Sequence, residues 1–558
     1  MDLKGETMKL SGSKIILETL KENNVDTLFG YPGGAVIPLY DALYDEMESF
    51  THIRPAHEQH MVHAADAYAR TTGKVGVAIA TSGPGATNTV TGIANAYMDS
   101  VPIVIITGQV PNMLLGKDSF QEVDITGMTL PITKHNYLVR KVEDLAQVVN
   151  EAMYVAAEGR PGPVLVDVPK DVFLAETEYI KPDKLNNKED KIVPSMSSID
   201  RAATLINKSK KPVVYAGGGV RISKNDTLLQ KLVEKNDIPT ANSFMGFGTI
   251  PRDHRLSLGL VGMHGHRETN LAVTESDLII AIGARFSDRV IGKPDEFAPK
   301  AKIIHIDIDD TEIDKNTKDC VPLTGDMKSI LELLYQKIEK NSRKEWLESI
   351  LKEKIDEPEK DKFVPKNILE TVNGYYKEDT VVATDVGQHQ MWTGQFWKFK
   401  KSNEFVTSGG LGTMGFGLGA AIGAKVGNPD KDVVLITGDA SFRMNSIELL
   451  TVSKYKLPIR MVMMNNHSLG MVRQWQRMFS NSRYSETDTL DFVDNVKLMD
   501  AYGIKGYKVK SIEDLKGVLE NTKNLKEAIF IECLIDKDES VYPIVPPGRP
   551  INELLLNG

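Results

Sequence analysis

The sequence predicts an α/β protein made of three doubly wound parallel-sheet domains. Short apolar runs rich in β-branched residues alternate with segments of helical periodicity, which is typical of buried parallel strands joined by crossover helices. Glycine-rich turns follow several of these runs, at the strand ends where such sheets bind ligands. The length of 558 residues suits three or four domains of about 150 residues each.

Composition excludes several classes of protein. Hydrophobic residues make up 41% and charged residues 26%, as in soluble globular proteins. The net charge of −9 and the lack of a dominant Lys/Arg cluster argue against a nucleic-acid or membrane-surface partner. Two cysteines, Cys320 and Cys533, suit a reducing compartment, and no apolar run reaches the length of a membrane span. Residues 1–10 do not resemble a signal peptide, so we expect a cytoplasmic protein.

The first domain is expected over residues 8–175. It should contain helices at 13–23, 57–70 and 90–97, and strands at 27–30, 52–53, 75–80 and 101–107, with turns at 31–34 and 81–88. Residues 176–197 are polar and lysine-rich, with Pro182 and Pro194, and are predicted to be a linker.

The central domain is expected over residues 198–335, with strands at 212–215, 278–282 and 302–308. Gly217, Gly218 and Gly219 follow the first of these strands but lack the full Gly-x-Gly-x-x-Gly spacing, so alone they are a weak signal of phosphate binding. Residues 337–362 are charged, and apolar residues at helical spacing predict a packed helix there.

The third domain is expected over residues 366–558. A strand at 381–385 precedes the stretch SGGLGTMGFGLGAAIGA at 408–424, which echoes SGPGATN in the first domain. Each is a glycine-rich turn that leads into a helix of small residues, so the two domains are predicted to be related lobes.

Residues 433–470 contain the best candidate for a metal site. We predict a strand at 433–436, a turn at 438–441, a helix at 446–455 and a strand at 459–464. If the strands are parallel neighbours, Asp439 and Asn466 both lie just past their carboxyl ends. A carboxylate, an amide oxygen and a backbone carbonyl suit Mg²⁺ that holds a ligand phosphate. Taken alone, Gly-Asp and Asn-Asn are also ordinary turn chemistry.

Longer segments point to one family. Asp439 and Asn466 are 27 residues apart, with a predicted strand at each end, as in the thiamine-diphosphate motif GD(G/A/S) followed by NN. The other segments, in chain order, include FGYPGGAVIPLYDAL, PAHEQHMVHAADAYAR, FQEVD, RPGPVLVDVPKD, GDASF, NNHSLGMVRQWQ and VYPIVPPG. On these segments the chain resembles the acetolactate synthase (acetohydroxyacid synthase) family of thiamine-diphosphate enzymes. The resemblance implies a pyrimidine-binding domain, a central FAD-binding-like domain and a diphosphate- and magnesium-binding domain, in that order.

The resemblance also implies a reaction. Members decarboxylate pyruvate on thiamine diphosphate and join the hydroxyethyl unit to a second pyruvate, giving 2-acetolactate, or to 2-oxobutanoate, giving 2-aceto-2-hydroxybutanoate. This is the first common step of valine, leucine and isoleucine biosynthesis. A homodimer or a dimer of dimers is implied, because the pyrimidine-binding domain of one subunit faces the diphosphate-binding domain of another. A separate small regulatory subunit is implied as well.

Site residues follow from the resemblance, position by position. Glu58 matches the glutamate that hydrogen-bonds the cofactor pyrimidine, although an isolated first-turn glutamate more often complements a helix dipole. Gly34 and Gln121 match residues beside the reacting carbon, and Lys170 is placed in the same catalytic set. Asp439, Asn466 and the Ser468 carbonyl match the magnesium ligands. The remaining thiamine-diphosphate contacts would be Pro32, Pro84, Asn88, Gly387, Gln388, His389, Gly412, Met414, Gly438, Ala440, Ser441 and Gly470.

Substrate and flavin positions complete the set. Phe120, Lys170, Met471 and Trp475 match the walls of the substrate channel, and Arg289 matches the arginine that receives the substrate carboxylate. The FAD-contacting positions would be Arg160, Gly217, Gly218, Gly219, Met263, His264, Gly283, Arg285, Arg289 and Asp326. FAD would be structural, because the reaction has no net redox change. The family usually has RFDDR where this chain has RFSDR at 285–289, so one acid is lost.

Two alternatives remain. The first is another thiamine-dependent decarboxylase or carboligase, such as the FAD-free acetolactate synthases; glyoxylate carboligase is disfavoured because it lacks the glutamate matched by Glu58. The second is a non-catalytic scaffold, which would be expected to lose Glu58, Asp439 and Asn466 first.

Overall fold

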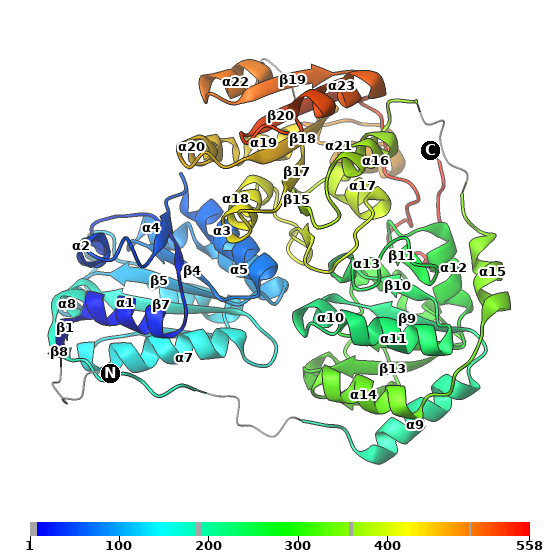
Figure 1. Cartoon of the computed structure of the whole chain (residues 1–558), viewed down its shortest axis with the longest axis horizontal. Coiled ribbons are helices and arrows are strands. Elements are labelled where there is room, and N and C mark those ends of the chain that lie inside the picture. Colours follow the sequence, from blue (N-terminus) through cyan, green and yellow to red (C-terminus); the bar gives the residue numbers. More distant parts are fainter. Residues whose placement is uncertain (1–7, 186–191, 356–360, 490–492, 558) are drawn as a thin grey trace.

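The computed structural model describes residues 8–185, 192–355, 361–489 and 493–557. This part of the chain contains three six-stranded parallel sheets with helices on their faces, and Figure 1 shows them as three lobes. The predicted α/β class is therefore confirmed. Each sheet lies within one of the predicted domain ranges, 8–175, 198–335 and 366–558.

The first lobe has the strand order β3-β2-β4-β5-β7-β6. Its strands are β2 (Thr27–Gly30), β3 (Thr51–Ile53), β4 (Gly76–Ala80), β5 (Ile103–Gln109), β6 (His135–Leu138) and β7 (Pro163–Pro169). Its helices are α1 (Gly12–Glu22), α2 (Ile37–Tyr44), α3 (Glu58–Thr72), α4 (Pro84–Thr87), α5 (Val90–Met98), α6 (Ile125–Thr129), α7 (Leu145–Ala157) and α8 (Lys170–Leu174).

The central lobe has the order β11-β10-β9-β12-β13-β14, the doubly wound arrangement of dinucleotide-binding folds. Its strands are β9 (Pro212–Ala216), β10 (Thr240–Asn242), β11 (Ser257–Leu260), β12 (Leu278–Ile282), β13 (Lys302–Asp307) and β14 (Val321–Thr324). Its helices are α9 (Met196–Lys208), α10 (Gly218–Ile222), α11 (Asp226–Asn236), α12 (Arg267–Glu275), α13 (Asp288–Ile291), α14 (Met327–Lys337) and α15 (Lys344–Leu351).

The third lobe repeats the topology of the first. Its order, β16-β15-β17-β18-β20-β19, places the second strand of the lobe at one edge and the fifth at the other, as in the first lobe. Its strands are β15 (Val381–Thr384), β16 (Phe405–Val406), β17 (Val433–Gly438), β18 (Ile459–Asn465), β19 (Lys505–Val509) and β20 (Ile529–Leu534). Its helices are α16 (Pro365–Tyr375), α17 (Gln388–Phe396), α18 (Gly417–Gly427), α19 (Asp439–Arg443), α20 (Leu449–Lys454), α21 (Gly470–Phe479), α22 (Asn495–Ala501) and α23 (Ile512–Thr522). A shared strand order is what two related lobes would have.

Three local predictions were wrong. The turn predicted at 438–441 is a direct passage from β17 into α19, because extended Gly438 is already the N-cap residue of that helix. The loop predicted at 81–88 contains the short helix α4. The linker predicted at 176–197 begins with β8 (Glu176–Glu178), which pairs antiparallel with β1 (Lys9–Ser11). Residues 186–191 of that linker and residues 356–360 of the helix predicted within 337–362 lie outside the described residues.

The first and third lobes pack through α3 and α18, which lie side by side in Figure 1. Arg70 on α3 pairs with Asp66 at 2.5 Å and Asp99 at 3.0 Å, and all three side chains are buried. Asp99 in turn accepts the backbone N–H groups of Gly409 and Gly410 at 2.9 and 2.7 Å. A buried ion network of the first lobe thus holds the glycine-rich loop of the third.

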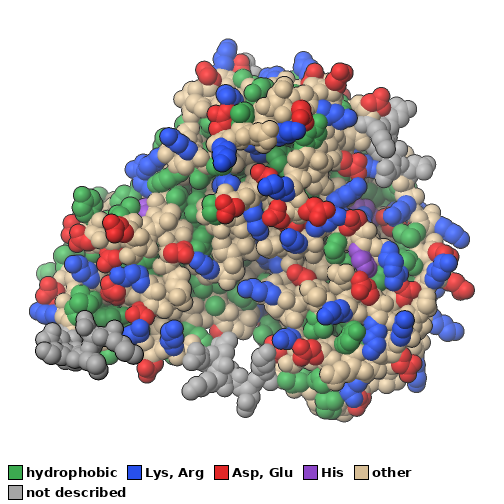
Figure 2. All heavy atoms as spheres, viewed as in Figure 1, with side chains coloured by type: hydrophobic (Ala, Val, Ile, Leu, Met, Phe, Trp, Pro, Cys, Tyr) green, Lys and Arg blue, Asp and Glu red, His purple; other side chains and the backbone are tan. Residues whose placement is uncertain are grey.

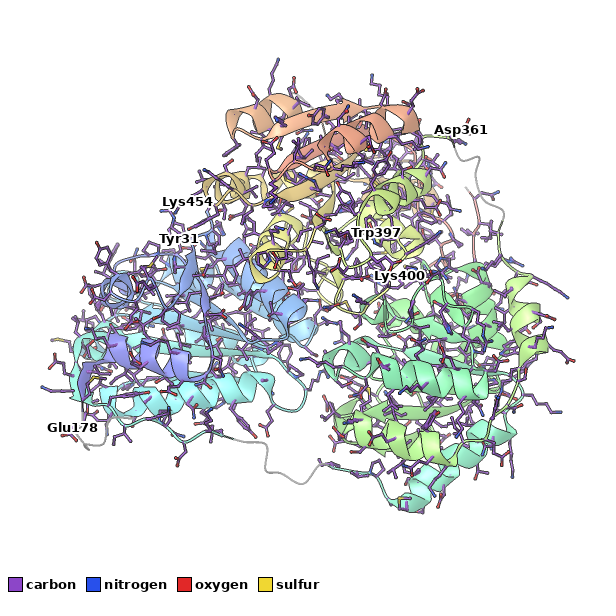
Figure 3. The ribbon with its side chains drawn as sticks, viewed as in Figure 1. Tyr31, Glu178, Asp361, Trp397, Lys400 and Lys454 are labelled. Carbon is purple, nitrogen blue, oxygen red and sulfur yellow. The ribbon has the colours of Figure 1, made fainter. Side chains whose placement is uncertain are left out.

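The borders between the lobes carry further polar contacts. Tyr31 and Lys454 mark the border of the first and third lobes in Figure 3, where the backbone N–H of Arg54 donates to the Tyr455 hydroxyl at 2.9 Å. Lys400 marks the border of the third and central lobes and forms an ion pair with Asp253.

The surface carries charges of both signs. Lys/Arg and Asp/Glu side chains are interspersed over the face seen in Figure 2. Within the described ranges, no helix is both long and apolar enough to cross a bilayer.

Candidate active site

A buried carboxylate lies where a metal ligand is predicted. β17 and β18 are parallel neighbours, so Asp439 and Asn466 leave adjacent strand ends as expected. Asp439 is only 2% exposed, and its Oδ2 accepts a hydrogen bond from the Thr489 hydroxyl at 2.6 Å. Burial raises the pKa of the Asp439 carboxyl, and the Thr489 bond opposes that shift. A cation would compensate this buried charge.

The second half of the predicted metal site is a polar turn after β18. Asn466 Nδ2 donates to Gln388 Oε1 at 2.9 Å, which orients the amide and leaves its Oδ1 as the atom that can bind a cation. Ser468 is buried, and its hydroxyl donates to the Thr487 carbonyl at 3.0 Å. One carboxylate with neutral amide and carbonyl oxygens matches the preference of Mg²⁺.

The diphosphate positions surround a buried histidine. A Cβ at Gly438 would lie 2.8 Å from His389 Nδ1, and one at Gly387 would lie 2.9 Å from His389 Cε1, so glycine is required at both positions. Burial lowers the pKa of His389 to about 3, which keeps its ring neutral. Its buried Nε2 has no hydrogen-bond partner within the described residues. The missing side chains at Gly387 and Gly438 let backbone N–H groups approach a phosphate, so these residues fit a magnesium diphosphate group.

The glycine-rich loop before α18 is also held by the buried carboxylate of Asp385. Asp385 is fully buried and accepts the N–H groups of Gly415 at 2.8 Å and Gly417 at 3.1 Å, together with Asn445 Nδ2 at 2.8 Å. Gly412 and Gly415 have φ of +72° and +89°, the region that favours glycine. Half-buried Met414 is held between these two glycines.

The predicted pyrimidine side lies on the first lobe. Glu58 is the first residue of α3, and its Oε2 accepts a hydrogen bond from Asn88 Nδ2 at 2.9 Å. Gln121 has a φ of +60° and packs against Gly83, where a Cβ would lie 2.8 Å from its carbonyl oxygen. Half-buried Lys170 begins α8. Four other predicted site residues of the first lobe are exposed: Pro32, Gly34, Pro84 and Phe120. Phe120, a predicted residue of the substrate channel, is 88% exposed.

A cavity of about 1550 Å³ collects most of the other predicted residues. Those that line it are Arg160, Gly218, Gly219, Met263, His264, Gly283, Arg285, Arg289, Asp326, Gly387, Gly412, Met471 and Trp475. Gly217 is not among the lining residues and lies against Ala284. Other first-lobe residues, such as Arg70 and Asp99, line this cavity, but the predicted residues Glu58, Gln121 and Lys170 are not among its described lining residues. The cavity of one chain therefore joins most of the flavin positions with Arg289, Met471, Trp475 and two diphosphate-side glycines, Gly387 and Gly412. Like Glu58, the predicted metal ligands Asp439 and Asn466 do not line the cavity within the described part of the chain.

Two arginines that line the cavity, Arg160 and Arg289, have different ion-pair partners. Arg160 pairs with Asp309 at 2.9 Å and with Glu312 at 2.8 Å. The Arg289 side chain is 64% exposed, and its polar contacts in the described part of the chain are a long ion pair of 3.7 Å with Asp288 and a hydrogen bond of 3.8 Å to Met263 Sδ. Of these two guanidinium groups, Arg289 is better placed to receive a substrate carboxylate.

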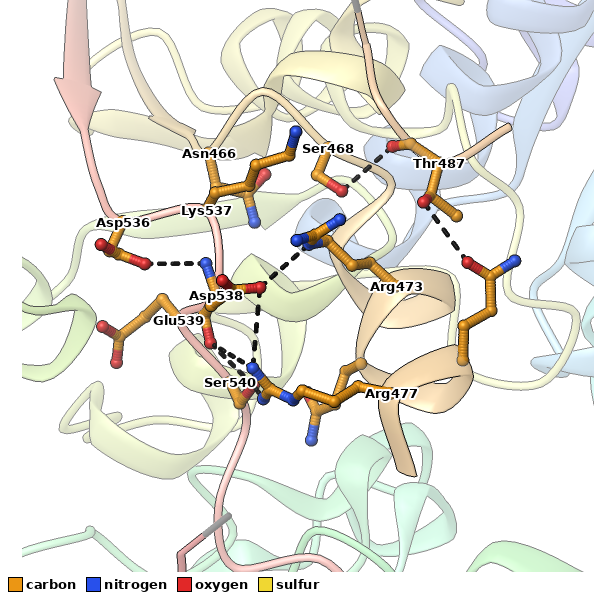
Figure 4. A network of polar contacts seen from close by, with 12 residues as sticks. Asn466, Ser468, Arg473, Arg477, Thr487, Asp536, Lys537, Asp538, Glu539 and Ser540 are labelled. Carbon is orange, nitrogen blue, oxygen red and sulfur yellow. Dashed lines mark hydrogen bonds and ion pairs between the residues drawn. The ribbon is translucent and has the colours of Figure 1, made fainter. Parts of the chain in front are cut away.

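Helix α21, which carries Met471 and Trp475, is fixed by the chain after β20. Gln474 and the Val541 backbone exchange two hydrogen bonds of 3.0 and 2.9 Å. Figure 4 shows Arg473 and Arg477 both reaching Asp538. These contacts hold one face of α21 toward the cavity.

Comparison with known proteins identifies the family of this chain. Its residues 10–128, 199–334 and 385–533 match models of the thiamine pyrophosphate enzyme N-terminal TPP binding domain, central domain and C-terminal TPP binding domain. The acetolactate synthase large subunit of Lactococcus lactis is 43% identical over 98% of this chain and 96% of its own length. The acetolactate synthase isozyme 2 large subunit of Escherichia coli is 42% identical over 98% of this chain and 99% of its own length. The acetolactate synthase large subunit of Porphyra purpurea is 44% identical over 97% of this chain and 94% of its own length. The chain belongs to the acetolactate synthase large-subunit family of thiamine pyrophosphate enzymes. The resemblance stated from the sequence is confirmed.

Several polar residues of this acetolactate synthase family member were missed by sequence reasoning. Thr489 bonds Asp439, Asp385 organises the glycine-rich loop, and Glu448 contacts the chain just before Glu58. Asp385 gave a usable signal, because it is an acid at a strand end. Thr489 and Glu448 gave none, since neither stands in a pattern that points to its partner.

Proposed function

We propose that this chain is the catalytic subunit of an acetolactate synthase, which decarboxylates pyruvate and condenses the remaining two-carbon unit with pyruvate or 2-oxobutanoate. The observation that carries the proposal is identity of 42–44% to acetolactate synthase large subunits over nearly the whole chain. The placement of Asp439 and Asn466 at adjacent strand ends supports it.

Two sets of residues would hold the cofactor. Asp439, Asn466 and the Ser468 carbonyl would bind Mg²⁺, and His389 with its flanking glycines would accept the diphosphate. Bound thiamine diphosphate would supply the electron sink that decarboxylation of a 2-oxoacid requires. Glu58, oriented by Asn88, would hold a proton at the pyrimidine ring nitrogen.

A homodimer, alone or as a dimer of dimers, would complete each site. The 88% exposure of Phe120, a predicted residue of the substrate channel, supports this. Phe120, Gly34, Gln121 and Lys170 would then face the cavity of the partner. The large-subunit family supports a separate small regulatory subunit as a further partner, and we place the complex in the cytoplasm.

The cavity residues would bind substrate and FAD. The size of the cavity and its glycine-lined wall beside β9 support a dinucleotide, whose role would be structural. Arg289 would receive the carboxylate of the acceptor 2-oxoacid. Trp475 would contact the extra methylene of 2-oxobutanoate, which is worth about 1–3 kcal/mol and gives a preference for that acceptor.

Thr489→Val should weaken Mg²⁺ binding by about tenfold to hundredfold, because it removes the hydroxyl that orients the Asp439 carboxylate. Thr489→Ser should bind normally. Titration of Mg²⁺ at fixed thiamine diphosphate measures the effect. Thr487→Val, in the same segment but with a side chain that contacts Gln476, is the matched control. Equal affinity of the two valine variants would contradict this role.

The activity is tested by incubating the purified chain with pyruvate, thiamine diphosphate, Mg²⁺ and FAD, and measuring acetolactate and acetaldehyde together. Mainly acetolactate is expected. Mainly acetaldehyde would favour another thiamine-dependent decarboxylase. Activity without flavin, and no flavin absorbance retained after desalting, would favour the FAD-free acetolactate synthases.

A further inference from the structure

A buried carboxylate of the third lobe accepts hydrogen bonds from the backbone immediately before Glu58. Glu448 ends the 3₁₀ turn Ser446–Glu448 and has no exposed surface. The backbone N–H of Ala56 lies 3.0 Å from both of its oxygens, and the N–H of His57 donates to Oε1 at 3.1 Å. These bonds join positions 391 and 392 residues apart in the sequence.

Two side chains complete the surroundings of this carboxylate. The Thr451 hydroxyl donates to Glu448 Oε2 at 2.6 Å, and His60 Nδ1 lies 3.1 Å from Oε1. A carboxylate only accepts, so Nδ1 carries the proton of the His60 bond. Four donors therefore share one carboxylate, which is about as many as its lone pairs can serve. Such a fully satisfied buried group fixes geometry strongly.

The first-lobe residues that contact Glu448 lie at the start of α3. His57 is the N-cap residue, and its Nδ1 accepts the N–H of Gln59 at 3.1 Å. Glu58 is the next residue and begins the helix. Glu448 thus sets the position of the first turn of α3 against the third lobe, while Asn88 sets only the direction of the Glu58 side chain.

We propose that Glu448 is a positioning residue for Glu58. Through Ala56, His57 and His60 it fixes where the Glu58 carboxylate stands when the cofactor pyrimidine arrives. The inference rests on the proposed function, since Glu58 acts only on bound cofactor. A buried group that merely joined two lobes would affect stability and would leave the chemical step unchanged.

Three variants test this role. Glu448→Ala should lower kcat by about tenfold to hundredfold, because a shift of about 1 Å in a catalytic group has effects of that size. Its KM for pyruvate and its affinity for thiamine diphosphate should change little, since the third lobe holds the diphosphate end. Glu448→Gln should restore most of kcat, because its amide oxygen can still accept the two backbone N–H groups.

Glu404→Ala is the matched control: Glu404 is also buried and accepts two backbone N–H groups, at 2.8 and 3.1 Å, but within the third lobe. It should cost stability and leave kcat unchanged.

A double-mutant cycle with Glu58→Gln decides between positioning and general support. If Glu448 acts through Glu58, the variant with both substitutions turns over at the rate of Glu58→Gln alone. Effects that multiply, or full kcat in Glu448→Ala beside an impaired Glu58→Gln, would overturn the inference. Normal turnover of Glu58→Gln would instead overturn the proposed role of Glu58, and this inference with it. Should Glu448→Ala not fold, Glu448→Asp takes its place, because its shorter side chain cannot reach all four donors.

Discussion

Glutamine at Glu58 should leave the fold and thiamine diphosphate binding intact and lower turnover by at least about a hundredfold. The amide oxygen of the new side chain can still accept the Asn88 bond of 2.9 Å, so the start of α3 keeps its geometry. It cannot hold a proton at the cofactor ring nitrogen as a carboxylate does. Steady-state kcat and the dissociation constant of thiamine diphosphate, measured on the same preparation, check both halves of the expectation.

A glutamate in the first turn of another helix provides the control for Glu58. Glu268 is buried in the first turn of α12, in the central lobe. Glu268→Gln reports what such a glutamate contributes to its own helix, and it should leave turnover near normal. A Glu58→Gln variant that also kept near-normal turnover would refute the assignment of Glu58 and reduce it to a dipole-complementing residue.

The sequence predicted the elements and the ligand edge of the third lobe because those depend on local pattern. The apolar runs at 433–436 and 459–464 were predicted to be buried strands, and the structure pairs them in parallel, which brings Asp439 and Asn466 to adjacent strand ends. The same reasoning placed the glycine-rich loop before α18, whereas the segment predicted as a loop at 81–88 contains the short helix α4. The roles of individual residues came from family resemblance, since spacing alone does not separate a metal ligand from a turn.

The contacts that orient the site could not be predicted in this way. Thr489 lies 50 residues from Asp439 in a segment without periodicity, and Glu448 meets His57 across 391 residues. Periodicity reports which face of an element is buried and not what that face meets. Phe120 shows the opposite difficulty: its predicted place in a channel wall and its 88% exposure agree only if a second chain covers it.

Alanine at Asp439 should weaken Mg²⁺ and thiamine diphosphate together, each by at least about a hundredfold. Loss of a group that only orients a metal ligand costs about tenfold to hundredfold in affinity, so loss of the ligand itself should cost more. The two affinities should fall together because Asp439 would hold Mg²⁺, and Mg²⁺ would neutralise the charge of the diphosphate. Titrating Mg²⁺ at fixed thiamine diphosphate, and then the reverse, by calorimetry measures both.

Comparing the loss of Mg²⁺ affinity in Asp439→Ala with that in Thr489→Val distinguishes the predicted metal ligand from the residue that orients it. The Thr489 hydroxyl donates to Asp439 Oδ2, while the Thr489 backbone N–H donates to the His467 carbonyl at 3.1 Å, a bond that a valine variant keeps. Removing the hydroxyl from an Asp439→Ala protein should therefore change nothing further. Unchanged affinities in Asp439→Ala would exclude the carboxylate as a metal ligand. Loss of Mg²⁺ affinity with thiamine diphosphate binding retained would mean that His389 and the glycine backbone hold the diphosphate without the metal. Joint loss would identify Asp439, at the end of β17, as the residue that holds Mg²⁺ for the diphosphate.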